Sequence, residues 1–356
     1  MKKPASWLVG LCFALGVFTP AGAQPDAWRS LMQQADRLYQ QGWYDQAARA
    51  AARALEAAER DLGPEHPDVA TSLNLLALAY RAKGEYRLAE PPQKRSLAIM
   101  EKFLGPEHHS VAIAIGNLAE LYQAQGRYAE AEELYGRALR NVERVLGPNH
   151  PNVATWLNSL AELHYAQARF AAAQPLYERA LAIRERALGP YNPAVAASLN
   201  NLAALHRARG DYATAEPLYR RSLEIAVQRL GREHPAVAVA LNNLAELHGA
   251  QRQYAEAELL HQRSLAILES ALGTDHPDLD PTLNYLAELY GAQGQYVAAE
   301  HFYRRSLAIR ETHFGPDHAA VAGSLESLSR LYRVMGRRDD AKRLAERAAA
   351  IRARAR

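Results

Sequence analysis

Residues 199–225 read LNNLAALHRARGDYATAEPLYRRSLEI, and they predict two helices joined by a tight turn. One face of the first helix is formed by Leu199, Leu202, Ala203 and His206. These positions fall at i, i+3, i+4 and i+7, which is the spacing of one helical face. Gly210 is typical of the left-handed residue that ends a helix, and Asp211 can cap the helix that follows. The stretch therefore predicts a helical hairpin.

The hairpin pattern recurs every 42 residues along almost the whole chain. The glycine that closes it is repeated as Gly63, Gly105, Gly147, Gly189, Gly231, Gly273 and Gly315. Another position is alanine in all eight copies, namely Ala47, Ala89, Ala131, Ala173, Ala215, Ala257, Ala299 and Ala341. Alanine at a helix crossing lets two axes approach to about 8–10 Å. A period of this length is typical of a solenoid in which each unit stacks on its neighbours.

The pattern resembles the tetratricopeptide repeat (TPR). The small and large residues that carry the resemblance are Leu199, Leu202, Ala203, His206, Gly210, Tyr212, Ala215, Tyr219 and Ser222. The long period, the string Leu199-Asn-Asn-Leu-Ala and the Gly-Pro-x-His-Pro loops are most similar to the repeats of kinesin light chains. The resemblance covers about residues 27–356 and implies an all-α, right-handed α-solenoid superhelix of about eight helix-turn-helix repeats. It specifies function weakly, because such repeats are scaffolds for many partners.

The expected domain boundaries follow from the period. Residues 1–23 precede a solenoid over residues 24–356. Its repeats are expected at about 27–66, 67–108, 109–150, 151–192, 193–234, 235–276, 277–318 and 319–356.

The first 23 residues have the features of a cleavable secretory signal peptide. Lys2 and Lys3 precede an apolar run from Trp7 to Phe18, and a small-residue cleavage pattern ends at Ala23. The run is too short to span a bilayer as a mature anchor. We therefore expect a bacterial protein in the periplasm or secreted, without a membrane span after cleavage. An uncleaved N-terminal anchor is the alternative.

Composition bounds the classes of partner and chemistry. The chain has 42 basic and 39 acidic residues, and this balance argues against nucleic-acid binding, which needs a basic stripe. Its one cysteine, Cys12, falls in the signal segment, so the mature chain would lack a thiol. The tail, residues 337–356, is locally basic. It is interpreted as a solvated end cap, or alternatively as a contact with anionic lipid or an acidic partner.

The motifs of catalysis do not appear in the sequence. It contains no glycine-rich phosphate loop, nucleophile elbow or paired-cysteine metal site, and the repeats leave no room for another domain. We expect no enzymatic activity, no catalytic residue, no cofactor and no metal. The loop histidines recur 42 residues apart, too far in a solenoid to share one zinc ion. A loop-and-cap role is expected for His66, His108, His150, His234, His276 and His318.

A second histidine set shares a helix position with tyrosines. The column contains Tyr80, Tyr122, His164, His206, His248, Tyr290 and Tyr332. It is interpreted as a half-buried aromatic slot that tolerates imidazole. A pH-sensitive patch is the alternative, because imidazole titrates near neutrality.

Asparagine recurs at one position of the first helix, although it is a mediocre helix former. This first column contains Asn74, Asn158, Asn200, Asn242 and Asn284, and Gly116 interrupts it. An amide carries both donors and an acceptor, so a ladder of amides can bond the backbone of an extended peptide. By resemblance, the first helices line a concave groove, and related proteins bind peptides there with such asparagines. The alternative is that these amides bridge neighbouring helices. We favour bridging for a second column, Asn117, Asn201 and Asn243.

Charged residues flank the first column along the helix. One turn further lie Glu120, Glu162, Glu246 and Glu288, and beyond them Arg81 and Arg207. Such a groove would be acidic in parts. It departs from the basic-edged grooves of kinesin light chains, so a neutral or basic peptide is the better prediction than an acidic one.

The leading hypothesis is a non-catalytic scaffold that binds an extended peptide or partner segment in this groove. Asn158, Asn200, Asn242 and Asn284 would hold the peptide backbone, and Glu162, Glu246, Glu288 and Arg207 would select side chains. One alternative is a structural or oligomerisation module of a cell-envelope assembly, and a homo-oligomer is left open. A second is a polysaccharide-handling protein or enzyme that uses paired carboxylates.

Overall fold

The computed structural model describes residues 26–354, which form sixteen α-helices, one short 3-10 turn and no strand. The expected signal segment, residues 1–23, lies outside the described residues. The chain divides after Pro190 into two compact units. Within residues 26–354, no helix is long and apolar enough to cross a membrane.

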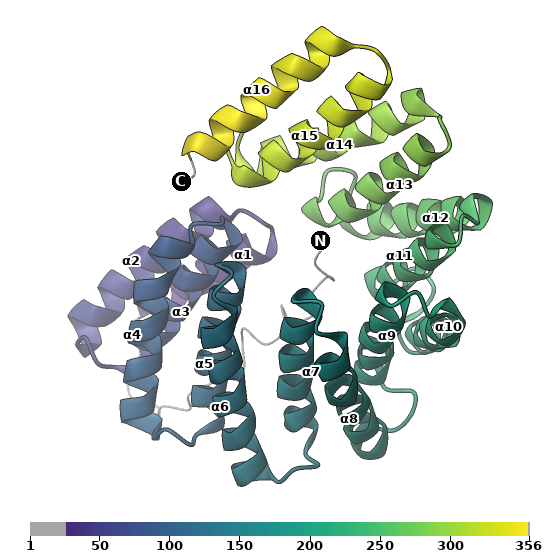
Figure 1. The fold of residues 1–356 in the computed structure, drawn as a ribbon. Helices are drawn as coiled ribbons and strands as arrows, with labels where there is room; N and C mark the ends of the chain where they lie inside the picture. Colours follow the sequence, from purple (N-terminus) through teal and green to yellow (C-terminus); the bar gives the residue numbers. More distant parts are fainter. Residues whose placement is uncertain (1–25, 355–356) are drawn as a thin grey trace. The chain divides into compact units, whose positions relative to one another are not determined.

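The helices pair in chain order (Figure 1). The first members, called A helices, are α1 (Asp26–Gln40), α3 (Pro67–Ala82), α5 (His109–Ala124), α7 (Pro151–Ala166), α9 (Pro193–Ala208), α11 (Pro235–Ala250), α13 (Asp280–Ala292) and α15 (Ala319–Val334). The second members, called B helices, are α2 (Tyr44–Leu62), α4 (Tyr86–Leu104), α6 (Tyr128–Leu146), α8 (Phe170–Leu188), α10 (Tyr212–Leu230), α12 (Tyr254–Leu272), α14 (Tyr296–Phe314) and α16 (Arg338–Arg354). The 3-10 turn η2 (Pro277–Leu279) precedes α13.

Packing follows the pairing. Each A helix packs on its own B helix, and within each unit each B helix packs on the A helix of the next pair. The predicted all-α solenoid of helical hairpins is thereby confirmed.

The loop histidines are N-caps, as the sequence predicted. In each case the ring Nδ1 accepts a hydrogen bond from the backbone N–H two residues later, at 3.1–3.2 Å. These caps are His66, His108, His150, His234, His276 and His318. Asn192 does the same before α9 through its side-chain oxygen, at 2.9 Å. A cap satisfies an N–H group that the first turn of a helix leaves unpaired.

The turn between A and B helices needs a residue with positive φ. Glycine supplies it in most pairs, with φ of 78° at Gly210. Ala168 and Arg252 take the same conformation, with φ of 57° and 62°. A side chain in the left-handed region costs roughly 1–2 kcal/mol. Two turns are therefore strained.

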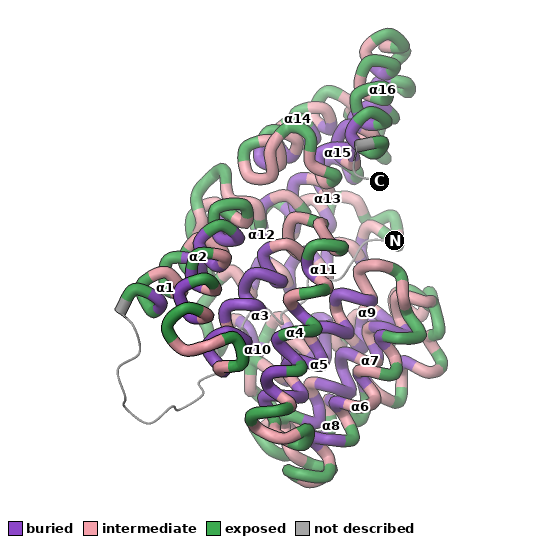
Figure 2. The backbone as a smooth tube through the Cα atoms, turned by 90° about the vertical axis from the view of Figure 1, so that its left-hand side faces the viewer, coloured by how far each residue is buried: buried purple, intermediate pink, exposed green. Residues whose placement is uncertain are grey.

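Small residues form the centre of each pair. The alanine column from Ala47 to Ala299 is fully buried, and Ala341 is nearly so. The largest fully buried side chains include Tyr135, Tyr177 and Tyr219, which share one B-helix position. Figure 2 shows buried residues along the packed helices and exposed residues at the turns. The core is thus a row of interhelical layers, which leaves polar columns of the A helices near the surface.

Candidate functional site

The predicted site residues lie on the A helices, so they form one polar surface per unit. We call these eleven residues the A-face residues: Asn74, Asn158, Asn200, Asn242, Asn284, Glu120, Glu162, Glu246, Glu288, Arg81 and Arg207. Within each unit, contacts also occur between consecutive A helices, as between α9 and α11. Side chains on neighbouring A helices can therefore interact directly.

In the first unit, an ion pair joins the end of α3 to α5. Arg81 Nη1 pairs with Glu120 Oε2, and both side chains keep about a quarter of their surface exposed. The buried hydroxyl of Tyr135 on α6 lies beneath this pair. Burial raises its pKa well above the usual value, and the negative charges of Glu120 and Glu162 raise it further. The tyrosine stays neutral under the charged layer.

The second unit repeats this pair three periods later. Arg207 Nη2 on α9 lies 3.1 Å from Glu246 Oε2 on α11, with side chains 27% and 17% exposed. Tyr285 on α13 hydrogen-bonds Glu246. Burial raises the pKa of this tyrosine far above its usual value, and the negative charge of Glu246 raises it further. Its ring stacks on His261 of α12, with centroids 5.3 Å apart. Both units thus present a partly exposed arginine–glutamate pair, next to the buried Tyr135 in the first and the half-buried Tyr285 in the second.

The asparagines of the first column lie deeper than the charged pairs. Asn74, Asn158, Asn200 and Asn242 are only 4–9% exposed, while Asn284 is half-buried. Their depth brings their amides into contact with neighbouring helices, and the partners differ from copy to copy.

Asn74 and Asn242 are held by the B helix of their own pair. The side-chain oxygen of Asn74 accepts from Gln93 Nε2 on α4 at 3.2 Å. That of Asn242 lies 2.8 Å from His261 Nδ1 on α12, and its amide nitrogen donates to Thr282 on α13 at 2.7 Å. The B-helix partner stands 19 residues after the asparagine in both cases. These two amides bridge helices.

Asn158 and Asn284 bond within their own A helix. Asn158 donates to Glu162 at 2.7 Å, and Asn284 donates to the backbone oxygen of Asp280 at 2.7 Å. Asn284 also reaches Ser306 on α14 at 2.9 Å. Asn117 of the second column, on α5, donates to the side-chain oxygen of Asn74 on α3 at 2.8 Å. This contact agrees with the bridging role favoured for the second column.

Asn200 differs from the others. Its side-chain oxygen is buried and has no hydrogen-bond partner among residues 26–354. The residue 19 positions later is Tyr219, and the residue that corresponds to Thr282 is Ala240, whose methyl group cannot hydrogen-bond. Rotation of the Asn200 side chain toward solvent therefore breaks no hydrogen bond to its oxygen. The same rotation of Asn74 or Asn242 would break at least one hydrogen bond to a neighbouring helix.

The gap in the asparagine column has a steric cause. A Cβ at Gly116 would lie 2.3 Å from the ring of Trp156 on α7. The other A helices carry serine, alanine or threonine at the position that corresponds to Trp156. The tryptophan fills the place of an asparagine side chain, so the ladder of amides is interrupted here.

The structure also shows a part-buried polar cluster that the sequence analysis missed. Arg310 on α14 pairs with Asp280 at the start of α13 at 2.5 Å, and Ser306 donates to the same carboxylate at 2.5 Å. Six of the other seven copies carry alanine at the position of Asp280, and the first copy carries Trp28. The signal was therefore available in the sequence as a charged residue in a column that is otherwise mostly alanine.

The arrangement offers amides and paired charges of the kind that bind a polypeptide. Among the described residues, no group of three histidine, cysteine or acidic side chains could hold a metal ion. The bridging interpretation accounts for Asn74 and Asn242, and the groove interpretation remains a prediction that fits Asn200 best. The charges that reach the surface come from the exposed Glu288 and from five half-buried side chains, namely Arg81, Glu120, Glu162, Arg207 and Glu246.

The sequence matches the tetratricopeptide repeat family model. The matched residues are 29–102, 110–186, 159–226, 194–270, 253–312 and 278–354. No curated protein sequence matches the chain.

Solved structures with a similar fold include BtubC (BKLC) from P. vanneervenii. It is 28% identical, with a TM-score of 0.51, and the match covers 67% of this chain and 91% of BtubC. A putative kinesin light chain of Podosopora anserina with nearly identical TPR-like repeats is 29% identical, with a TM-score of 0.48 over 58% of this chain and 99% of its own.

A Rap protein in complex with Competence and Sporulation Factor is similar over more of the chain. It is 14% identical, with a TM-score of 0.56, and the match covers 92% of this chain and 98% of the Rap chain. At this identity the likeness concerns the fold alone.

Proposed function

The chain belongs to the tetratricopeptide repeat family, and we propose that it is a non-catalytic scaffold that binds an extended peptide or partner segment along its A helices. The observation that carries the proposal is the repeated, partly exposed arginine–glutamate pair, Arg81–Glu120 in one unit and Arg207–Glu246 in the other. Each pair offers a donor and an acceptor of opposite charge to an incoming chain. Asn200, with an oxygen that has no partner among the described residues, would bond a peptide backbone.

The carboxylates favour a neutral or basic segment over an acidic one. Glu162 in the first unit and Glu288 in the second share the helix position of Glu120 and Glu246, and they add negative charge to that column. A basic side chain brought by a partner would gain charge-assisted hydrogen bonds there.

A peptide-array experiment tests the proposal. The full chain is incubated with randomised 12-residue peptides, beside an Arg207→Gln/Glu246→Gln variant. The matched control is Arg220→Gln/Glu216→Gln, which removes an exposed ion pair on α10 of the same unit. We expect selected peptides to bind the parent and the control alike, and to bind the A-face variant about tenfold more weakly. Equal binding by all three would overturn the groove assignment.

The structural alternative makes a different prediction. A module of a cell-envelope assembly without a groove ligand would form a discrete oligomer that survives the Arg207→Gln/Glu246→Gln change. Light scattering on parent and variant separates the two functions. A monomer with peptide affinity supports the scaffold.

We further propose export across a bacterial inner membrane, with function in the periplasm or outside the cell. Lys2 and Lys3, the apolar run and the small-residue pattern ending at Ala23 support it. The mass of the chain recovered from the envelope fraction tests it. A protein that begins after residue 23 is expected, and an intact chain confined to the cytoplasm would contradict export.

A further inference from the structure

Two tyrosines of the aromatic A-helix column, Tyr122 and Tyr332, make the same three-part contact. In the third pair, the Tyr122 hydroxyl donates to Glu90 of the preceding B helix at 3.3 Å. Arg127, five residues after the tyrosine, places its guanidinium carbon 3.8 Å from the ring centroid. Its Nη1 also donates to Glu90 at 2.9 Å. Ring, carboxylate and guanidinium therefore satisfy one another.

The last pair contains the same contact. The Tyr332 hydroxyl donates to Glu300 at 2.7 Å, and the guanidinium carbon of Arg337 lies 3.9 Å from the ring centroid. Arg337 Nη1 lies 3.0 and 3.1 Å from the two oxygens of Glu300. A cation over an aromatic face and beside a carboxylate is held by both electrostatic terms.

The seventh pair has two of the three parts. The Tyr290 hydroxyl donates to Glu258 at 2.8 Å, as its counterparts do. The position of the arginine is occupied by Gln295, whose amide reaches only Gln293, at 3.5 Å. The further partner of Glu258 is the neutral Gln262, at 3.0 Å.

Glu258 is consequently a carboxylate without a cation. Among residues 26–354 it forms no ion pair, whereas each of its counterparts pairs with arginine or lysine. These counterparts are Glu90, Glu132, Glu216 and Glu300.

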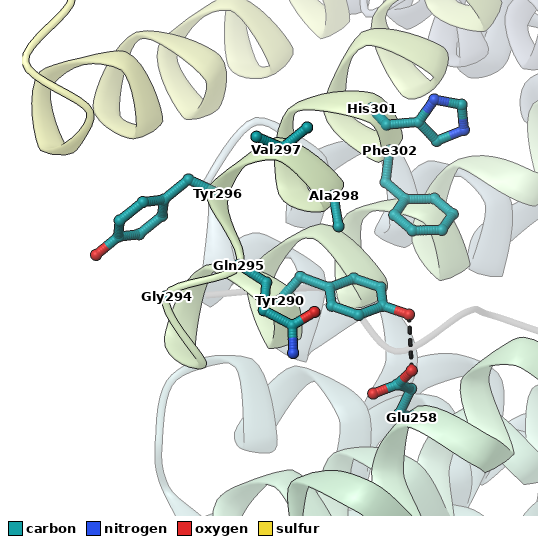
Figure 3. Close-up of a pocket in the computed structure, with 9 residues that line it drawn as sticks. All are labelled: Glu258, Tyr290, Gly294, Gln295, Tyr296, Val297, Ala298, His301 and Phe302. Carbon is teal, nitrogen blue, oxygen red and sulfur yellow. Dashed lines mark hydrogen bonds between the residues drawn. The ribbon is translucent and has the colours of Figure 1, made fainter.

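A pocket of about 690 Å³ opens where the arginine is missing (Figure 3). Glu258, Tyr290 and Gln295 line it together with the first turns of α14, and no lysine or arginine does so. Phe302 stacks on Tyr290 with the rings nearly parallel and their centroids 5.6 Å apart. Most other copies carry leucine at the position of Phe302, so the aromatic wall is particular to this pocket.

We propose that this pocket takes an arginine side chain from a partner polypeptide, with its guanidinium paired to Glu258 and lying against the Tyr290–Phe302 rings. The incoming group restores the contact that Arg127 and Arg337 make inside the chain. A planar guanidinium suits both the ring face and the two carboxylate oxygens, which a lysine ammonium cannot match. The pocket contains none of the A-face residues, so the site stands apart from the proposed peptide-binding surface.

The direct test uses three defined peptides on the full chain. Acetyl-Gly-Arg-Gly-amide, its citrulline analogue and its lysine analogue are titrated while the methyl NMR signals of Val297 and Ala298 are followed. Citrulline keeps the shape of arginine without the charge. We expect the arginine peptide to bind at least about fivefold more tightly than either analogue. Equal affinity for arginine and citrulline, or for arginine and lysine, would overturn the assignment.

Two variants and a control locate the effect. Glu258→Gln is expected to abolish the preference for arginine over citrulline, while Glu256→Gln, an exposed change on the same helix, leaves it intact. Gln295→Arg supplies the guanidinium from within, as at Tyr122 and Tyr332, and is expected to block the peptide without loss of helical signal. If the Gln295→Arg chain is folded and binds the arginine peptide as the parent does, the pocket is not the site.

Discussion

At the scale of single residues, Ala168 and Arg252 hold a backbone conformation that other A–B turns give to glycine. Both side chains are exposed, so neither gains packing contacts that would offset the strain. We expect Ala168→Gly and Arg252→Gly each to stabilise the chain by about 0.5–1 kcal/mol, because the left-handed strain outweighs the added freedom of unfolded glycine. Urea unfolding followed by circular dichroism measures the change.

The reverse substitution is the matched control. A Cβ at Gly210 meets no atom within 4 Å, so Gly210→Ala adds no clash and changes only the backbone strain and the freedom of the unfolded chain. It should destabilise the chain by about the amount that the other two changes gain. If all three variants unfold at the urea concentration of the parent, the turns tolerate side chains and the strain argument fails.

At the scale of helices, Asp280 and Arg310 join α13 to α14 inside the seventh pair. Their side chains are 14% and 23% exposed, so loss of one charge strands the other in a largely dry layer. We expect Arg310→Leu or Asp280→Ala alone to cost about 2 kcal/mol, below the range for fully buried pairs. The double variant should be nearly neutral, because it supplies the alanine and the apolar residue that most other copies carry at these two positions.

Unfolding free energies of the two single variants and the double variant complete a double-mutant cycle. The exposed pair Arg220–Glu216 provides the comparison, with a coupling of at most about 0.5 kcal/mol. Additive losses at Asp280 and Arg310 would show that the two charges do not depend on each other.

The helix pairs and caps could be predicted because they are set by local, repeated signals. Apolar spacing gave the helices, and the position of the loop histidines before proline indicated their caps. The hydrogen bonds of the asparagine column were harder to predict, because those of Asn74, Asn242 and Asn284 involve residues outside their own helix. The side-chain oxygens of Asn74 and Asn242 are hydrogen-bonded to Gln93 and His261, and the residue at this B-helix position varies between copies. Burial of an amide is a tertiary property that the column alone does not encode.

At the scale of the whole molecule, two histidines make stability depend on pH, namely His108, the N-cap of α5, and His164 on α7. An imidazole that accepts at Nδ1 must be unprotonated there. Burial lowers the pKa of His108, and neighbouring His109 lowers it further; burial also lowers that of His164, against the opposing effect of Glu132. A lowered pKa favours the neutral ring in the folded state. The stabilisation is present above about pH 6.5, the ordinary histidine value, and is lost as the pH falls below it.

We therefore expect a lower urea midpoint at pH 5.5 than at pH 7.5. The variant His108→Asn/His164→Tyr should reduce this difference. Both replacements are residues that this chain already uses. Asparagine is the N-cap of α9, and tyrosine occupies the position of His164 in four copies. A variant with the full pH dependence of the parent would assign the effect to other groups.

Trp156 and Gly116 have a consequence for the history of the array. Tandem repeats grow and shrink when the gene copies or loses a unit, which is harmless only if every junction is equivalent. Here the ring of Trp156 occupies the space that a side chain at position 116 would need. A duplication that placed such a tryptophan after a unit with asparagine would begin with a steric collision. The repeat with Gly116 and the repeat with Trp156 must therefore be duplicated or lost together, because neither can be exchanged alone for another repeat without a clash or a gap.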